Sequence, residues 1–343
     1  MVDSLEELRG LKVLVFGAGG GGDVLGAYIL YQRLRSIGAH PMLGSVVWER
    51  YTVDPVPGPI PLEAVEGPVR AWRSIALVDG SIVALREGRR VKPQLARLLQ
   101  ALGEEGVYLD LSKGAVGMVE AMRIIVDELG FDYVIGLDTG GDALALGCED
   151  GLRSPLADAV SLAGLAGVRD RSGLAILSPG ADGELEWIQV LQYISRIARM
   201  GGLIGVYGLN RREYNAAYSV SEAVVSEASK IPLRAFSGEY GETRIRGGTR
   251  RVTITPVSAS MYLLDTDKAY QWTPLPGLVE GTRSIEEARR RLNERCIYTE
   301  LDLEEELYRL KSMQPGRPMT VDDIYHEGRR RLFMEGCRAV ECR

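Results

Sequence analysis

The first 230 residues show short apolar runs that alternate with longer helix-like patterns. The opening pair is typical, because a β-rich run over residues 12–17 precedes residues 24–37, where Leu25, Tyr28, Ile29 and Leu34 recur close to the helical period. Further strands are expected at 41–48, 107–111, 133–137, 174–177 and 203–207, and further helices at 93–102, 116–129, 154–166, 185–200 and 213–229. This alternation predicts an α/β fold with a doubly wound, mostly parallel sheet, Rossmann-like and covered on both faces.

Two parts of the chain do not follow this alternation of strands and helices. Residues 54–68 are rich in Pro and Gly and predict a loop, while Asp79-Gly80 between two β-rich runs predicts a hairpin insertion near residues 74–86. After residue 230, a lone alternating strand at 250–256 and charged helices at 284–292 and 300–311 replace the pattern. We therefore expect a Rossmann-like core over residues 1–230 and a helical C-terminal extension over 231–343 that packs on it.

Three of the expected strands stop at short stretches of glycine and acid. These stretches are GAGGGGD at 17–23, DTGGD at 138–142 and SPGADG at 178–183. A helix-like pattern follows each of them, so strand–helix–strand connections should bring all three to one edge of a parallel sheet, where open α/β folds bind ligands. We expect Asp138, Asp142 and the glycines at 19–22 to line one pocket at this edge.

The first stretch formally satisfies GxGxxG between a strand and a helix, where bare amides and a helix N-terminus can approach a phosphate. Four successive glycines satisfy almost any spacing, however, and Asp23 would repel a pyrophosphate unless a metal ion lay between them. Asp23 is alternatively the N-cap of the helix, a role that Asp fills well. The cofactor-binding residues predicted from this stretch are Gly17, Gly19, Gly20, Gly21 and Gly22.

The second stretch places two carboxylates four residues apart at the end of an apolar strand. Hard oxygen ligands with flexible backbone between them suit Mg²⁺, which binds through one or two carboxylates plus substrate phosphate. We predict Asp138 and Asp142 as metal ligands, with Thr139, Gly140 and Gly141 as neighbouring cofactor-binding residues. The alternative interpretation is a set of acids that only shape turns and caps.

The sequence contains two histidines, His40 and His326, and neither lies in a predicted site, so a Ser-His-Asp triad is not credible. A catalytic base must then be a carboxylate, a lysine, a tyrosine or metal-bound water. We predict Asp23 or Asp150 as the base and Lys113 as the group that neutralises charge.

Together these residues predict a Mg²⁺-dependent enzyme that acts on a phosphorylated small molecule or nucleotide by phosphoryl transfer or hydrolysis. Two alternatives stay open. One is a dinucleotide-binding oxidoreductase, in which Glu49 at the end of the second strand would bind the ribose hydroxyls, although it lies rather far beyond Gly17. The other is a non-catalytic protein that binds a small molecule.

The composition of the chain limits the classes of binding partner that we expect. A net charge of −6 argues against nucleic-acid binding, and the Arg-rich segments 244–251 and 329–331 are interpreted as solvated faces. No apolar run approaches the roughly 18 residues that a membrane helix needs. We expect a cytoplasmic protein with a small-molecule ligand, and a homo-oligomer stays open. Only six of the 41 basic residues are Lys, a bias suggestive of a thermophile or of a GC-rich genome.

The four cysteines contain no CxxC pair, so a structural zinc site is not expected. Cys337 and Cys342 could form a disulfide in a hyperthermophile, and free buried thiols are the preferred interpretation.

The combined motifs GAGGGGD, DTGGD and EDGLRSPLAD, the last at residues 149–158, resemble those of a mostly archaeal family known only as a domain of unknown function. The resemblance spans most of the chain. It implies that the glycine and acid stretches are family signatures, and it transfers no activity.

Overall fold

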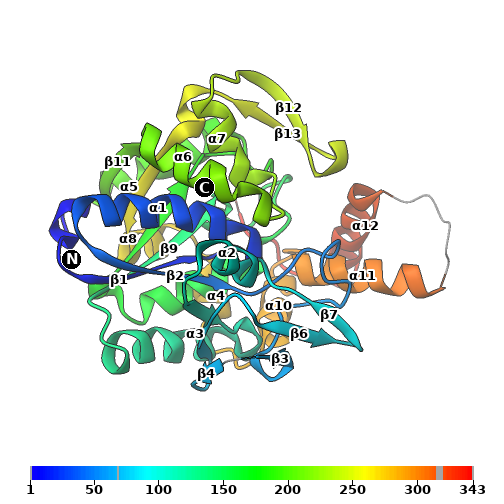
Figure 1. Ribbon diagram of the computed structural model, residues 1–343. Coiled ribbons are helices and arrows are strands. Elements are labelled where there is room, and N and C mark those ends of the chain that lie inside the picture. Colours follow the sequence, from blue (N-terminus) through cyan, green and yellow to red (C-terminus); the bar gives the residue numbers. More distant parts are fainter. Residues whose placement is uncertain (1, 68, 314–319, 342–343) are drawn as a thin grey trace.

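The computed structural model describes residues 2–67, 69–313 and 320–341 and is built around one large mixed sheet (Figure 1). Its nine strands follow the order β11-β14-β10-β9-β1-β2-β8-β5-β4. Their bounds are β1 Lys12–Gly17, β2 His40–Val46, β4 Val69–Ala71, β5 Ile75–Val78, β8 Gly106–Leu109, β9 Tyr133–Thr139, β10 Ser172–Leu177, β11 Leu203–Gly208 and β14 Ser260–Asp265. The predicted α/β fold with a mostly parallel sheet is confirmed.

The central strands β10, β9, β1, β2 and β8 are parallel neighbours. The chain moves from β1 outward to β2 and β8, and then returns to the other side of β1 with β9 and β10. The strand order therefore reverses between β1 and β9, and a crevice at such a switch point is where open α/β sheets bind ligands. In this register Gly17 pairs with Leu137, so the glycine stretch after β1 lies beside Asp138 near the end of β9.

Both faces of the sheet are buried, because successive strand residues point to opposite sides. On β1, Val13 and Val15 enter one apolar cluster, whereas Leu14 and Phe16 enter the other. Helices α1 (Val24–Ile37), α2 (Gln94–Leu102) and α6 (Arg211–Val220) cover the first face. Helices α3 (Gly114–Arg123), α4 (Pro155–Ala166) and α5 (Trp187–Arg199) cover the second.

Two predicted helices differ from the structure in extent. The helix expected at 116–129 is α3 followed by a π-helical segment, Ile124–Glu128. The helix expected at 213–229 ends with α6 at Val220 and continues as short 3-10 turns into α7, Ile231–Phe236.

The predicted hairpin near residues 74–86 is wrong in its pairing. Asp79-Gly80 does turn the chain between two strands, but β5 pairs with β4 and β8 in the large sheet. The next strand, β6 (Val83–Arg86), instead joins a small sheet between β3 (Val65–Glu66) and β7 (Arg89–Val91). The turn residues specified the reversal, and burial of each strand against different neighbours decided the pairing.

The chain after residue 230 contributes to the central sheet and is not purely helical. β14 lies between β10 and β11, antiparallel to both, and was not predicted. The strand expected alone at 250–256 is β13 (Arg250–Ile254), which forms a hairpin with β12 (Gly241–Ile245). The remaining helices are α8 Thr266–Trp272, α9 Leu275–Val279, α10 Ile285–Asn293, α11 Glu300–Met313 and α12 Val321–Met334.

Cys337 is bonded to Cys296, which corrects the expectation of free thiols and of a Cys337–Cys342 bridge. Cys342 itself lies outside the described residues. Within the described ranges, no helix combines the length and the apolar character needed to cross a membrane.

Candidate functional site

A cavity of about 570 Å³ opens at the carboxyl ends of the central strands. The strand ends contribute the glycines at 19–22, Asp23, Asp138, Thr139, Asp142 and Asp182 to its lining. The opposite wall comes from the β12–β13 hairpin and from helices α11 and α12, which Figure 1 shows beside the sheet. Segments far apart in the sequence thus enclose one site at the switch point.

Buried carboxylates are concentrated on the floor of this cavity. One carboxylate oxygen from each of Asp138, Asp142 and Asp158 lies within 4.8 Å of the other two. Asp142 also belongs to a second group of this size, with Asp182 and Glu184. All five side chains are at most 5% exposed, so water screens their mutual repulsion poorly.

Few hydrogen bonds satisfy these carboxylates. Asp138 accepts one from the backbone N–H of Ala143 at 3.1 Å, and Asp182 accepts one from that of Glu184 at 3.0 Å. Asp158 Oδ1 and Asp182 Oδ2 are buried and have no hydrogen-bond partner among the described residues. Buried polar atoms are normally paired, so these two oxygens are open to a further polar partner.

The protonation of the cluster reflects this environment. Burial, followed by the charges of neighbouring carboxylates, raises the pKa of Asp138, Asp142 and Asp158 well above the ordinary range. Burial also raises the pKa of Asp23 to about 7, although the backbone N–H of Gly19 opposes the shift. Without a compensating cation, these groups retain protons near neutral pH.

Glu184 differs from the other acids because its hydrogen-bonding capacity is filled. The backbone N–H groups of Arg153 and Ser154 donate to Oε2 at 2.6 and 2.9 Å, while the Ser154 hydroxyl and Arg250 Nη1 donate to Oε1. Burial alone would raise its pKa, but Arg250 and Arg246, together with the hydrogen bonds from Ser154 and Arg153, lower the pKa to about 2. Four donors leave no lone pair for a metal, so Glu184 positions Arg250.

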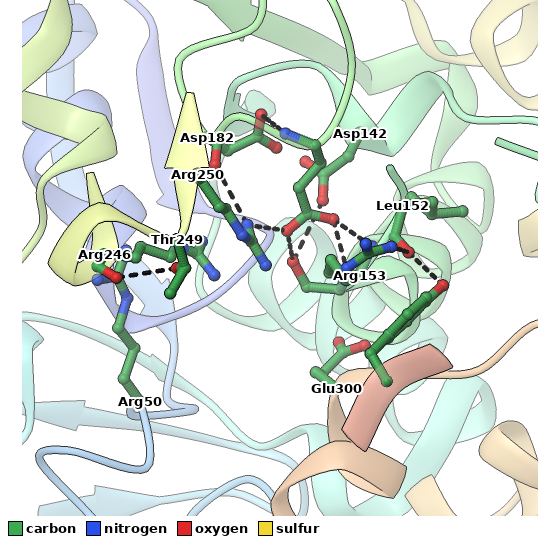
Figure 2. Close-up of polar contacts among 12 residues, drawn as sticks. Arg50, Asp142, Leu152, Arg153, Asp182, Arg246, Thr249, Arg250 and Glu300 are labelled. Atoms are coloured by element: carbon green, nitrogen blue, oxygen red, sulfur yellow. Dashed lines mark hydrogen bonds and ion pairs between the residues drawn. The ribbon is translucent and has the colours of Figure 1, made fainter. Parts of the chain in front are cut away.

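Four arginines face the carboxylates. Figure 2 shows Arg50 and Arg246 to the left of Arg250, which lies beside Asp182. Arg250 Nη1 donates to the Asp182 carbonyl at 3.2 Å as well as to Glu184. Arg153 packs against the ring of Tyr325, 3.7 Å from its centroid. The cavity therefore carries a negative floor and a positive wall.

The glycine stretch is packed against acidic side chains. A Cβ on Gly19 would lie 2.8 Å from Asp158 Oδ2 and 2.9 Å from Asp23 Oδ2, and one on Gly21 would lie 2.7 Å from Glu49 Oε1. Asp23 accepts the N–H of Gly19 at 3.0 Å and makes no side-chain cap to α1. These glycines thus give space to carboxylates, and a bare pyrophosphate would meet negative charge there.

Glu49, predicted to contact a ribose in the oxidoreductase alternative, lies at the same place. Its Oε1 accepts the N–H of Gln94 at 2.8 Å, at the start of α2, and its Oε2 is buried without a partner among the described residues. Burial raises its pKa to about 7.

Several predicted residues lie elsewhere. Lys113 forms an ion pair with Glu63 at 2.6 Å on the surface, and the side chain of Asp150 is 99% exposed and paired with Arg329 at 3.1 Å. Neither belongs to the described lining of the cavity. Gly17, Gly140 and Gly141 are also outside the described lining, and a Cβ on Gly140 would lie 2.4 Å from Asp182 Cγ. The missing side chains of these glycines leave space for neighbouring atoms to pack closely.

The site also contains residues to which the sequence analysis gave no role. Asp158 is the one acid of α4, a helix whose residues are all buried, and this isolation was a usable signal. Asp182 belongs to the third glycine and acid stretch. Arg246 and Arg250 lie in the segment interpreted as a solvated face, and that interpretation is wrong because both line the cavity.

The C-terminal helices complete the enclosure. Glu300 on α11 accepts the N–H groups of Leu156 and Ala157 at 3.0 and 2.8 Å, which caps the N-terminus of α4. Burial raises its pKa to about 8. Glu304 accepts the N–H of Gly58 and the indole N–H of Trp48, both at 2.9 Å, and burial raises its pKa to about 7.

The sequence profile of the DUF1152 family, described as a protein of unknown function, matches residues 14–308. The match includes the carboxylates of the cluster and the arginines of the wall. No curated protein and no solved structure matches the chain.

Proposed function

The chain belongs to the DUF1152 family of unknown function, and from its cavity we propose that it is a Mg²⁺-dependent enzyme acting on a phosphorylated small molecule or nucleotide, by phosphoryl transfer or hydrolysis. One observation carries the proposal. A buried group of carboxylates, Asp138, Asp142 and Asp158, faces a wall of arginines across a single cavity.

The carboxylates support a divalent cation. Ionised groups taken out of water are costly unless they are paired or coordinate a metal, and Asp158 and Asp182 each keep a buried oxygen without a partner among the described residues. Mg²⁺ prefers hard oxygen ligands and usually retains open positions for water or substrate phosphate. Asp138, Asp142 and Asp158 would hold the ion, with Asp182 adjacent.

The arginine wall supports a phosphorylated substrate. Guanidinium groups match the geometry and charge of phosphate oxygens, and a cation on the opposite side would neutralise charge that develops during transfer. The cavity volume, about 570 Å³, lies in the range of small-molecule sites. The order of the parallel strands, which reverses between β1 and β9, is consistent with a nucleotide-binding sheet.

Asp23 is the proposed general base. Its carboxyl lines the cavity beside the cluster, where it can accept a proton from a bound water or hydroxyl group. Asp23 would take the proton from the attacking water or hydroxyl group. Asp150 is not assigned this role, because its side chain is exposed outside the described lining of the cavity.

Thermal unfolding with a ligand panel tests the proposal. Nucleotides or sugar phosphates should raise the melting temperature only with Mg²⁺ present, by an amount that follows RT ln(1 + [L]/Kd), or roughly 2.7 kcal/mol at a hundredfold excess over Kd. Turnover of the stabilising compound is then measured by phosphate release or transfer.

Two other outcomes would redirect the assignment. Stabilisation by NAD or NADP that is indifferent to chelator would reject this proposal and favour the oxidoreductase. Stabilisation by a phosphorylated compound with no turnover under any acceptor would favour a binding protein.

A further inference from the structure

We propose that Arg50, Arg246 and Arg250 form the subsite for a terminal, dianionic phosphoryl group, so that the ligands of this protein are phosphomonoesters or compounds ending in a phosphate. The inference rests on the proposed function for its phosphorylated ligand. It departs from the sequence-based expectation, in which the glycines at 19–22 approach the phosphate and Lys113 neutralises charge.

Arg246 is the most informative member of this group. Its backbone adopts a left-handed conformation with φ of 54°, and the next two residues, Gly247 and Gly248, also have positive φ. A non-glycine residue in such a run is strained, and strain of this kind is typical of functional positions. Its Nε atom is buried and has no hydrogen-bond partner among the described residues.

The charges of the three arginines are not balanced by the protein. Glu184 neutralises Arg250 at 2.6 Å, whereas Glu227 is half-exposed and lies 3.9 Å from Arg50. The Arg246 guanidinium forms no ion pair within 4.0 Å in the described parts of the chain, and only its backbone N–H reaches a carboxylate, donating to Glu227 Oε2 at 2.6 Å. Burial, together with Arg250 and Arg50, lowers the pKa of Arg246 to about 9. A dianion placed among these groups would offset their excess positive charge.

Other candidates for the phosphate are already occupied. Arg153 stacks on Tyr325 and donates to the carbonyl groups of Asp150 and Leu152. The N-terminus of α4 is capped by Glu300, and the glycine stretch is packed by acids. Among the cavity arginines, Arg50 and Arg246 are therefore the more open cationic groups, and Arg250 lies beside them while bound to Glu184.

The rim of the cavity indicates where the organic part would lie. Tyr51, Val225, Leu303 and Leu307 line the same cavity, and Val225 is 50% exposed. An apolar substituent on the phosphate would cover this surface. Phenyl phosphate, a dianion above its second pKa near 6, is thus a suitable probe, and methyl phenyl phosphate is the matching monoanionic diester.

The test is isothermal titration of the full chain at pH 8 with these two probes, in the presence of Ca²⁺. The monoester should bind at least tenfold more tightly than the diester. Arg50→Ala and Arg246→Gly should each weaken monoester binding about 10- to 100-fold, the loss expected for a charge-assisted hydrogen bond. Arg251→Ala, which removes an exposed charge from the same hairpin, is the control and should bind normally.

Arg246→Gly has a second readout that separates binding from folding. Because glycine tolerates positive φ, this variant should unfold at the same temperature as the wild type or at a higher one, while it loses affinity for the monoester. Mn²⁺ titrated without phosphate should bind both proteins alike.

The subsite would be overturned if Arg246→Gly and Arg251→Ala lost equal affinity for the monoester, or if the wild type bound monoester and diester equally well. A wild-type protein that binds no Mn²⁺ would instead reject the proposed function. In that case phenyl phosphate is titrated without metal to test the arginine subsite separately. Tight binding that depends on Arg246 supports the subsite, and absence of binding rejects the subsite.

Discussion

Gly19 lies so close to Asp158 that a Cβ on the glycine would be 2.8 Å from Asp158 Oδ2 and 2.9 Å from Oδ1. The glycine therefore sets the position of a carboxylate in the proposed cation site. We expect Gly19→Ala to displace Asp158 and Asp23, and to weaken Mn²⁺ binding at least tenfold in a calorimetric titration.

Gly208→Ala is the matched control for this substitution. A Cβ on Gly208 has nothing within 4 Å among the described atoms, so the methyl group meets open space. Normal Mn²⁺ affinity in Gly19→Ala would show that the cluster tolerates the displacement or does not bind the cation.

Asp142→Asn removes the carboxylate shared by both groups of acids. Because neighbouring carboxylates repel one another in this buried site, the cation-free variant should be as stable as the wild type or more so. Activity and the rise in melting temperature on adding Mg²⁺ should both be lost. Asp150→Asn, at an exposed side chain outside the cavity, should behave as wild type in both measurements.

A Mg²⁺-dependent rise in Asp142→Asn equal to that of the wild type would return Asp142 to a turn-shaping role. Loss of turnover in Asp150→Asn would instead restore Asp150 as a candidate base.

Stability without cation should fall as pH rises from 5 to 8. The pKa of Asp23, Glu49 and Glu304 is about 7 and that of Glu300 about 8 in the folded protein, above their ordinary values of 3.8 to 4.5. The folded state therefore binds more protons than the unfolded state in this window, and the free energy of unfolding decreases with pH. The stability that these four groups contribute is fully present below their ordinary pKa values in the unfolded chain. It is lost as the pH rises through their folded-state pKa values of about 7 to 8.

Urea unfolding at constant ionic strength, in buffer treated with chelator, measures this trend. Added Mn²⁺ should restore stability at pH 8, because the cation replaces protons on the carboxylates, and its binding should release protons. Stability that increases between pH 5 and 8 without cation would contradict the shifts in these four groups.

Glu184→Gln should be strongly destabilising, because Arg250 would lose its buried charge partner and the four donors around Glu184 would be mismatched. Breaking such a buried pair costs roughly 3 to 5 kcal/mol. Glu186→Gln, at an exposed side chain two residues away, is the control for the same chemical change. Equal urea midpoints for the two variants would show that the ion pair contributes little to stability.

Local signals in the sequence predicted much of the fold, because strands and helices follow from short periodic patterns. The extents of β1 and α1 agree with the expected ranges. Pairing was harder, since partners lie far apart in the sequence. Asp79-Gly80 marked a turn between β5 and β6, yet each strand joined a different sheet.

The candidate site was predictable where its residues follow strands. Asp23, Asp138 and Asp142 lie at the switch point, as strand ends in a parallel sheet should. Arg246 and Arg250 could not be placed in the same way, because the hairpin that carries them folds over the sheet through tertiary packing. Glu300 reaches α4 from 143 and 144 residues away, and nothing in its local sequence marks that contact.

The placement of β14 between β10 and β11 has consequences for folding during synthesis and for limited proteolysis. β10 pairs with a strand that begins at Ser260, so the large sheet stays incomplete on the ribosome until that strand has emerged. A fragment that stops at residue 230 would leave the edges of β10 and β11 unpaired, and open apolar edges promote aggregation. Limited proteolysis near residue 230 should therefore release no soluble core, and a nicked protein should keep its two pieces together.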